Sequence, residues 1–89
     1  MICKIVGAKR EMGNFQGRDY DNVKIRVTHP AEGELVNQGL EFGDRVAEFK
    51  VKSTILPLEK AYDYYTSGVL LEIYFDQYKN PVLFNPIKK

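Results

Sequence analysis

The order in which strand-like and helix-like segments follow one another constrains this chain more than any single motif. Residues 21–28, 45–52 and 69–76 alternate apolar and polar side chains with a period of two, which is typical of half-buried strands. Residues 2–9 and 82–87 are rich in apolar side chains, and we interpret them as two further strands. The chain is therefore expected to be mainly β.

One helix interrupts this series of strands. Pro57 suits the first turn of a helix, and Gly68 suits the left-handed position that ends one. Between them, a stripe of residues at three–four spacing predicts a helical face turned toward the core, with Tyr64 on the opposite side. The members of this stripe are Leu58, Ala61, Tyr62 and Tyr65.

Three strands, a helix and two strands within 89 residues match the order of a small five-stranded Greek-key barrel of the OB type. Closing such a sheet removes most of its unpaired edges, and a helix between strands three and four covers the open end. The sequence therefore predicts a single OB-like domain over residues 1–89. We expect its core to contain Val23, Ile25, Val27, Phe42, Ala47, Phe49, Val51, Val69, Leu71, Ile73, Phe75 and Phe84.

Two connections between the predicted strands differ in composition. Residues 11–20 contain two glycines, Asn14 and Asp19, which are residue types of tight turns, so we expect a glycine-rich loop there. Residues 30–44 contain three glycines and four acidic residues. They predict a long loop, or a loop with a short helical turn.

The net charge of +1 hides an uneven distribution. Residues 1–28 hold six Lys/Arg and three Asp/Glu, residues 29–48 hold one Arg and five acids, and residues 49–89 hold six Lys and four acids. A basic body with an acidic middle still permits a nucleic-acid footprint on one face. Cys3 is the only cysteine, which excludes an intrachain disulfide. With no apolar run of membrane-spanning length and no secretory signal pattern, we expect a cytoplasmic protein.

A basic and aromatic surface is the main functional signal. If the second and third strands pair, four outward cations lie side by side and form a track for a phosphate backbone, flanked by loop aromatics that could stack on bases. The candidate nucleic-acid-binding residues are Phe15, Arg18, Tyr20, Lys24, Arg26, Lys50, Lys52, Tyr74, Tyr78 and Lys79. The alternatives are structural: the cations keep an exposed sheet soluble, Tyr20 caps the barrel, and Tyr74 packs across strands or in a dimer contact.

The pattern of strands and turns resembles the small single-stranded-DNA-binding proteins of phages and mobile genetic elements. The residues that carry the resemblance are the 4–9 segment, Gly13 and Gly17, the 20–27 and 69–75 strands, and Tyr78-Lys-Asn80. The resemblance spans nearly the whole chain. It implies an OB-type barrel that binds single-stranded DNA in replication or transfer.

The sequence offers little chemistry for catalysis. His29 precedes a proline at a strand end, where a turn role is expected, and one His with one distant Cys gives no metal-ligand spacing. Ser53 and Ser67 lie in no recognisable nucleophile motif, and no phosphate-binding glycine fingerprint is present. We therefore expect no enzyme, no cofactor, no metal and no small-molecule substrate.

These observations favour a sequence-tolerant binder of single-stranded nucleic acid, with DNA expected before RNA. The outward apolar residues Val46, Leu70 and Leu83 leave a homodimer open. One alternative is a protein-interaction module that uses a β-edge or the Tyr-rich helix with the acidic loop. Another is a regulatory protein that mimics nucleic acid through residues 32–48.

Overall fold

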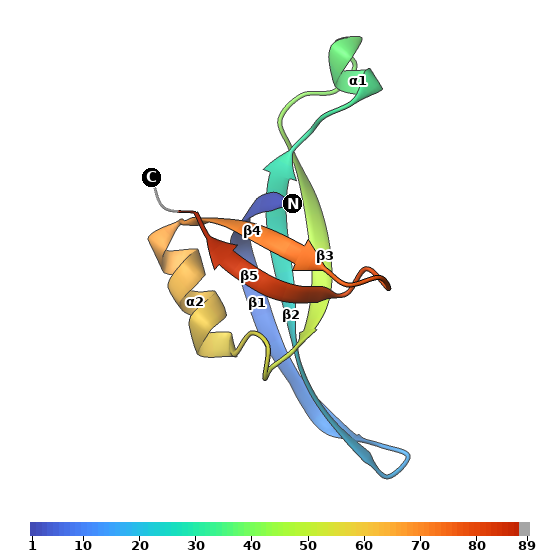
Figure 1. Cartoon of the computed structure of the whole chain (residues 1–89), viewed down its shortest axis with the longest axis vertical. Helices are drawn as coiled ribbons and strands as arrows, with labels where there is room; N and C mark the ends of the chain where they lie inside the picture. Colours follow the sequence, from blue (N-terminus) through green and yellow to red (C-terminus); the bar gives the residue numbers. More distant parts are fainter. Residues whose placement is uncertain (88–89) are drawn as a thin grey trace.

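The computed structural model describes residues 1–87. They form one antiparallel five-stranded sheet in the order β3-β2-β1-β4-β5, with one helix packed against it and a short one at its periphery (Figure 1). The mainly β prediction is confirmed, as is the helix between the third and fourth strands. The elements are β1 (Ile2–Phe15), β2 (Arg18–Pro30), α1 (Glu34–Asn37), β3 (Asp44–Lys52), α2 (Leu58–Ser67), β4 (Leu70–Phe75) and β5 (Pro81–Pro86).

The first two strands are much longer than predicted. The expected loop over residues 11–20 is a continuous β1–β2 ribbon that ends in a turn at Gln16 and Gly17, with φ values of 52° and 77°. Two successive positive φ values characterise the turn that best matches the twist of a hairpin. The ribbon lacks apolar alternation because it extends beyond the core, which is why its composition resembled that of a loop. We call residues 11–20 the distal hairpin.

Residues 31–43 form a second projection, which we call the acidic arm. It contains α1, as the alternative of a short helical turn predicted, and it extends from the opposite end of β2 (Figure 1). Arg45 secures the base of the arm: its guanidinium donates to both carboxylate oxygens of Glu41, at 2.7 and 2.6 Å, and to the carbonyl of Glu32 at 3.1 Å. Phe42, expected in the core, is 95% exposed here, so that prediction is wrong.

The core lies between the inner faces of β1–β3 and of β4. The inward residues of β2 are fully buried, and Leu71 and Ile73 of β4 face them across the core, as predicted. Phe49 of β3 meets Phe75 of β4 edge to face, with ring centroids 5.3 Å apart. The two inner faces thus pack as one layer of side chains.

Helix α2 covers one side of this core and packs against β1. It follows extended Pro57 and ends at Gly68 with φ of 68°, as predicted. Ala61 is buried as predicted, but Tyr64, expected to face away, is buried as well, while Tyr62 and Tyr65 are exposed. The expected inward stripe is therefore correct at Ala61 and wrong for the tyrosines. Both stripes satisfy helical spacing, and periodicity alone does not choose between them.

The sheet is strongly bent but open. β1 pairs with β4 over Ile2–Lys4 only, and an irregularity between Ile5 and Gly7 then directs the rest of β1 along β2 alone. The edge strands β3 and β5 contact each other, although no ladder joins them within residues 1–87. Neither described helix has the length and apolar character needed to cross a bilayer.

Candidate nucleic-acid interface

The outer face of β2 and β3 brings the predicted cations onto one surface. Lys24 and Lys50 are direct cross-strand partners, and Lys52 pairs with Asn22 in the same register. Partners in an antiparallel pair have Cβ atoms about 4.5–5.5 Å apart, so two lysines face each other at close range. The prediction that strands two and three pair is confirmed.

Two adjoining hollows run from the distal hairpin to the β4–β5 turn. The first is lined by Phe15, Arg18 and Tyr20 of the hairpin, and the second lies between the end of β3 and the turn. Asn22 and Lys50 line both hollows, so the two hollows adjoin at these residues. We call this surface the basic groove, defined by Phe15, Arg18, Tyr20, Asn22, Lys50 and Lys52, with Tyr78 and Lys79 in the turn at its end.

Tyr20 is placed on this surface by a glycine on the neighbouring strand. Gly13 is its cross-strand partner, and a Cβ atom on Gly13 would lie 2.6 Å from the Tyr20 hydroxyl oxygen. The absence of a side chain lets the tyrosine ring lie across the ribbon. Tyr20 remains 43% exposed, while Phe15 and Tyr78 at the two ends of the groove are 68% and 75% exposed. Exposed rings of this kind can stack on nucleobases.

Three carboxylates, those of Glu11, Asp19 and Asp76, line the groove, and each is engaged by a neighbouring group. Asp19 accepts a hydrogen bond from the side-chain amide of Asn14 at 2.8 Å. Glu11 contacts Lys9 at 3.3 Å and Lys24 at 3.5 Å. The hydrogen bond from Lys9, together with the charge of Lys24, holds the pKa of Glu11 below its ordinary value. Asp76 accepts hydrogen bonds from the backbone N–H groups of Tyr78 and Asn80, at 2.8 and 2.9 Å, and so shapes the turn.

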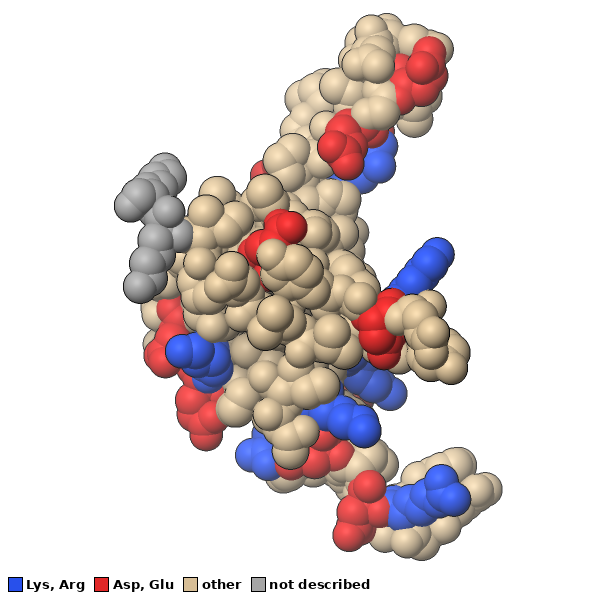
Figure 2. Space-filling view, in the orientation of Figure 1, with Lys and Arg blue, Asp and Glu red and all other residues tan. Residues whose placement is uncertain are grey.

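Four cations of the groove remain available to a ligand. The ion pairs found in residues 1–87 include none of Arg18, Lys50, Lys52 and Lys79. Figure 2 shows Lys and Arg atoms beside Asp and Glu atoms near the distal hairpin and the β4–β5 turn. Three cations and three carboxylates line the two hollows, so the basic character of the groove comes from cations that form no ion pair within residues 1–87, not from an excess of lining charge.

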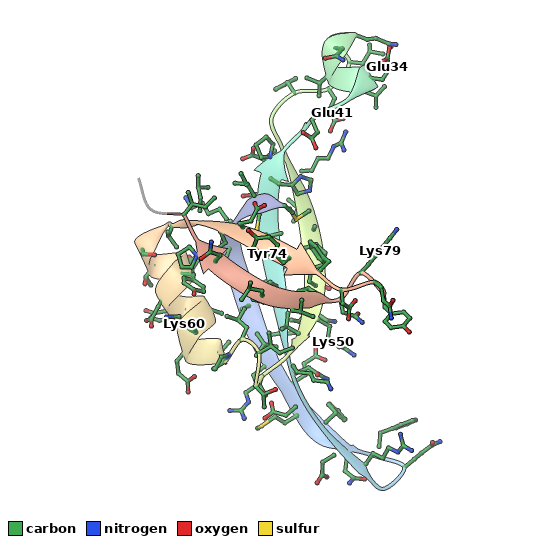
Figure 3. All side chains as sticks on the ribbon, in the orientation of Figure 1. Glu34, Glu41, Lys50, Lys60, Tyr74 and Lys79 are labelled. Atoms are coloured by element: carbon green, nitrogen blue, oxygen red, sulfur yellow. The ribbon has the colours of Figure 1, made fainter. Side chains whose placement is uncertain are left out.

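Three of the predicted residues lie outside the groove or are occupied. Lys24 borders the groove but contacts Glu48 as well as Glu11. Arg26 lies over Gly7, where any added side chain would collide with its guanidinium, and it lines a separate depression beside α2. Tyr74 lies on the outer face of β4, across the core from Lys50 (Figure 3).

Sequence reasoning missed two contributors on this side of the sheet. Asn22 lines both hollows, and its outward position was readable from the alternation of β2. Lys9 is the cross-strand partner of Lys24 on β1. The irregularity between Ile5 and Gly7 shifts the facing of β1, so simple alternation could not place Lys9.

The described chain holds no cluster of three or more potential metal ligands among its His, Cys, Asp and Glu residues. Cys3 is buried, and burial raises the pKa of its thiol to about 11, so it is protonated near neutral pH. No family model, no curated protein and no solved structure matches this chain.

Proposed function

We propose that this protein binds single-stranded DNA along the basic groove without reading its sequence. The observation that carries the proposal is the adjacency of the two hollows: Asn22 and Lys50 line both the hairpin hollow and the hollow at the β4–β5 turn. A nucleic-acid strand needs such an extended path, whereas a small ligand needs an enclosed pocket.

Each part of the groove has a distinct role in this proposal. Arg18, Lys50, Lys52 and Lys79 contact phosphates, and binding releases counterions from the strand. Phe15, Tyr20 and Tyr78 stack on bases, a contact worth roughly 1–3 kcal/mol per base and tolerant of sequence. Because none of these contacts reads base edges by hydrogen bonding, the expected specificity is for unpaired strands.

We further propose that the sheet is an OB-like barrel. The strand order places β1 between β2 and β4, and the edge strands β3 and β5 contact each other. OB barrels bind with the face of strands two and three and the loops that follow strands one and four. The basic groove occupies the corresponding elements here. The expected preference for DNA, and a role in phages or mobile elements, rest on the resemblance alone.

Fluorescence anisotropy with a labelled oligo-dT of about 20 nucleotides tests the proposal, because this length exceeds the site of one such domain. We expect saturable binding that weakens as salt is raised. A duplex of the same length should bind less tightly, and an oligo-U competitor measures the preference for DNA. Absence of oligo-dT binding at low salt contradicts the proposed function.

Two exposed tyrosines provide a matched test of stacking. Tyr78→Ala removes a ring from the groove, whereas Tyr62→Ala removes a ring from α2, away from it. Tyr78→Ala should weaken oligo-dT binding by about five-fold or more, with an unchanged salt dependence, because stacking is worth at least ~1 kcal/mol per base. Tyr62→Ala should leave binding unchanged. Equal effects of the two variants argue against stacking in the groove.

A further inference from the structure

The acidic arm displays apolar side chains that nothing in the described chain covers. Phe42 and Leu40 are 95% and 70% exposed, and Leu35 is also exposed. The arm is nonetheless organised: Arg45 clamps Glu41, and the Ala31 N–H donates to the Gly43 carbonyl at 2.9 Å. An ordered segment that holds large apolar side chains in water is typical of a contact surface.

Two carboxylates of the arm form no ion pair within the described chain. Glu41 is bound by Arg45, and Glu34 accepts a hydrogen bond from the Gln38 amide at 2.8 Å. Glu32 and Glu34, and Asp44 at the start of β3, take part in none of the ion pairs within residues 1–87. Figure 3 shows Glu34 and Glu41 on this projection, far from Lys50 and Lys79. The arm thus presents an exposed aromatic ring together with carboxylates that form no ion pair within residues 1–87.

The basic groove presents the complementary chemistry. It offers exposed aromatic rings and four cations that no carboxylate of the described chain engages. The Phe42 ring and the carboxylates of the arm resemble the bases and phosphates of a nucleic-acid strand. A surface suited to one of these ligands is therefore suited to the other.

The arm cannot reach the groove of its own chain. Pro30 at the base of the arm lies eight positions along β2 from Asn22 in the groove. At about 3.3 Å per residue, this distance is roughly 26 Å, and the arm extends further away. The groove that can receive the arm belongs to another copy.

We propose that two copies associate antiparallel, with the arm of each seated in the basic groove of the other. In Figure 1 the arm and the distal hairpin both lean toward the side of the β4–β5 turn. A two-fold axis on that side would make two identical arm–groove contacts and close the assembly as a dimer. In such a dimer, DNA and the arm of the second copy compete for the same groove. This consequence rests on the proposed function.

Sedimentation velocity of the whole protein at about 0.1 mM tests the association itself. We expect twice the 10.3 kDa chain mass at an ionic strength of ~0.01 M and the single-chain mass at ~1 M, because salt screens the exposed charges. A single-chain mass at low salt overturns the inference. So does a dimer that is insensitive to salt.

A charge exchange identifies the surfaces. Variant A carries Glu32→Lys and Glu34→Lys in the arm, and variant B carries Lys50→Glu and Lys52→Glu in the groove. Each variant alone places like charges in both contacts and should sediment as a monomer. An equimolar mixture should regain a dimer, because the arm of A then meets the groove of B. A mixture that stays monomeric overturns the arm–groove assignment.

A milder pair of variants avoids large charge changes. Phe42→Ala should raise the dimer dissociation constant at least five-fold, whereas Met12→Ala, which removes another exposed apolar side chain, should not change it. Equal effects contradict the proposed contact.

Oligo-dT added to the wild-type dimer should release monomers bound to DNA. If the charge exchange succeeds but oligo-dT does not bind, the dimer stands and the proposed DNA binding fails.

Discussion

The double substitution Lys50→Ala with Lys52→Ala gives the sharpest test of the basic groove. These lysines lie on the exposed face of β3 and line the depression that joins the distal hairpin to the β4–β5 turn. They make no ion pair with any residue of the described chain, so their removal should leave the fold intact. The effect on binding therefore reports their contacts with the ligand.

The expected magnitude follows from counting charges. Four available cations predict a slope of log K against log salt of about −2.8 for a single strand, at ~0.7 per phosphate contact. Between ~50 and ~200 mM salt, the wild-type protein should lose affinity roughly 50-fold. With two cations removed, the slope should fall to about −1.4 and the loss to roughly seven-fold.

Anisotropy titrations with oligo-dT at four or more salt concentrations measure the slope directly. Lys60→Ala is the matched control, because Lys60 is on α2 beside the Tyr64 ring and outside the groove (Figure 3). It removes one positive charge but should leave the slope unchanged. A wild-type slope in the double variant refutes the assignment of phosphates to the groove. A drop half as large in the Lys60 variant, which loses one charge where the double variant loses two, would show that net charge alone governs binding.

Three further predictions concern the scaffold and the arm. Ile25→Ala, at a fully buried position in the centre of the sheet, should cost about 2–5 kcal/mol of unfolding free energy in urea titrations, and a smaller loss would contradict the described core. Cys3 should react with a thiol reagent near pH 8 only as fast as the protein unfolds, because its raised pKa keeps it protonated; rapid labelling of the folded protein would argue against its burial. The hydrogen bond from Arg45 lowers the pKa of Glu41 from its ordinary value of 4.5. The contact therefore stabilises the arm at pH values above 4.5, and this stabilisation is lost as the pH falls through the lowered pKa of Glu41. NMR relaxation should therefore show the acidic arm loosening in acid and in Arg45→Ala at neutral pH, and an arm equally ordered in both conditions would contradict the clamp.

The parts of the fold that the sequence predicted are those where packing follows one period. Val23, Ile25 and Val27 alternate with polar residues, and all three are buried because β2 crosses the core. The two ends of α2 were predicted correctly from Pro57 and Gly68. Proline restricts the backbone to an angle that suits a helix start, and glycine readily adopts the left-handed conformation that ends a helix.

The errors arose where a segment leaves the core or where two patterns coexist. The distal hairpin is solvated on both faces, so its strands carry no alternation and were interpreted as a loop. Phe42 was placed in the core by residue type alone, although the acidic arm around it has nothing to pack against. On α2, Tyr64 and Tyr65 each fit a helical stripe, and only the position of the helix against β1 distinguishes them.

The sequence predicted the cations and the hairpin aromatics of the candidate site, but not which nearby residues lie outside it. The pairing of β2 with β3 brought Lys50 and Lys52 beside Asn22, as alternation implied. Arg26 has the same facing, yet it extends over Gly7 toward α2. The direction in which a long side chain extends depends on the free space beside it, which a strand pattern does not describe.

The base of the acidic arm is itself a rung of the sheet, since Pro30 and Asp44 are partners at the end of the β2–β3 ladder. Residues 31–43 lie between these partners and outside the core, so the packing of the core does not depend on the length of this segment. Replacing residues 31–43 with Asn-Gly, a pair suited to tight hairpins, should leave the melting temperature nearly unchanged. The arm, and with it the proposed contact between copies, can therefore be lengthened, shortened or removed without a change in the sheet.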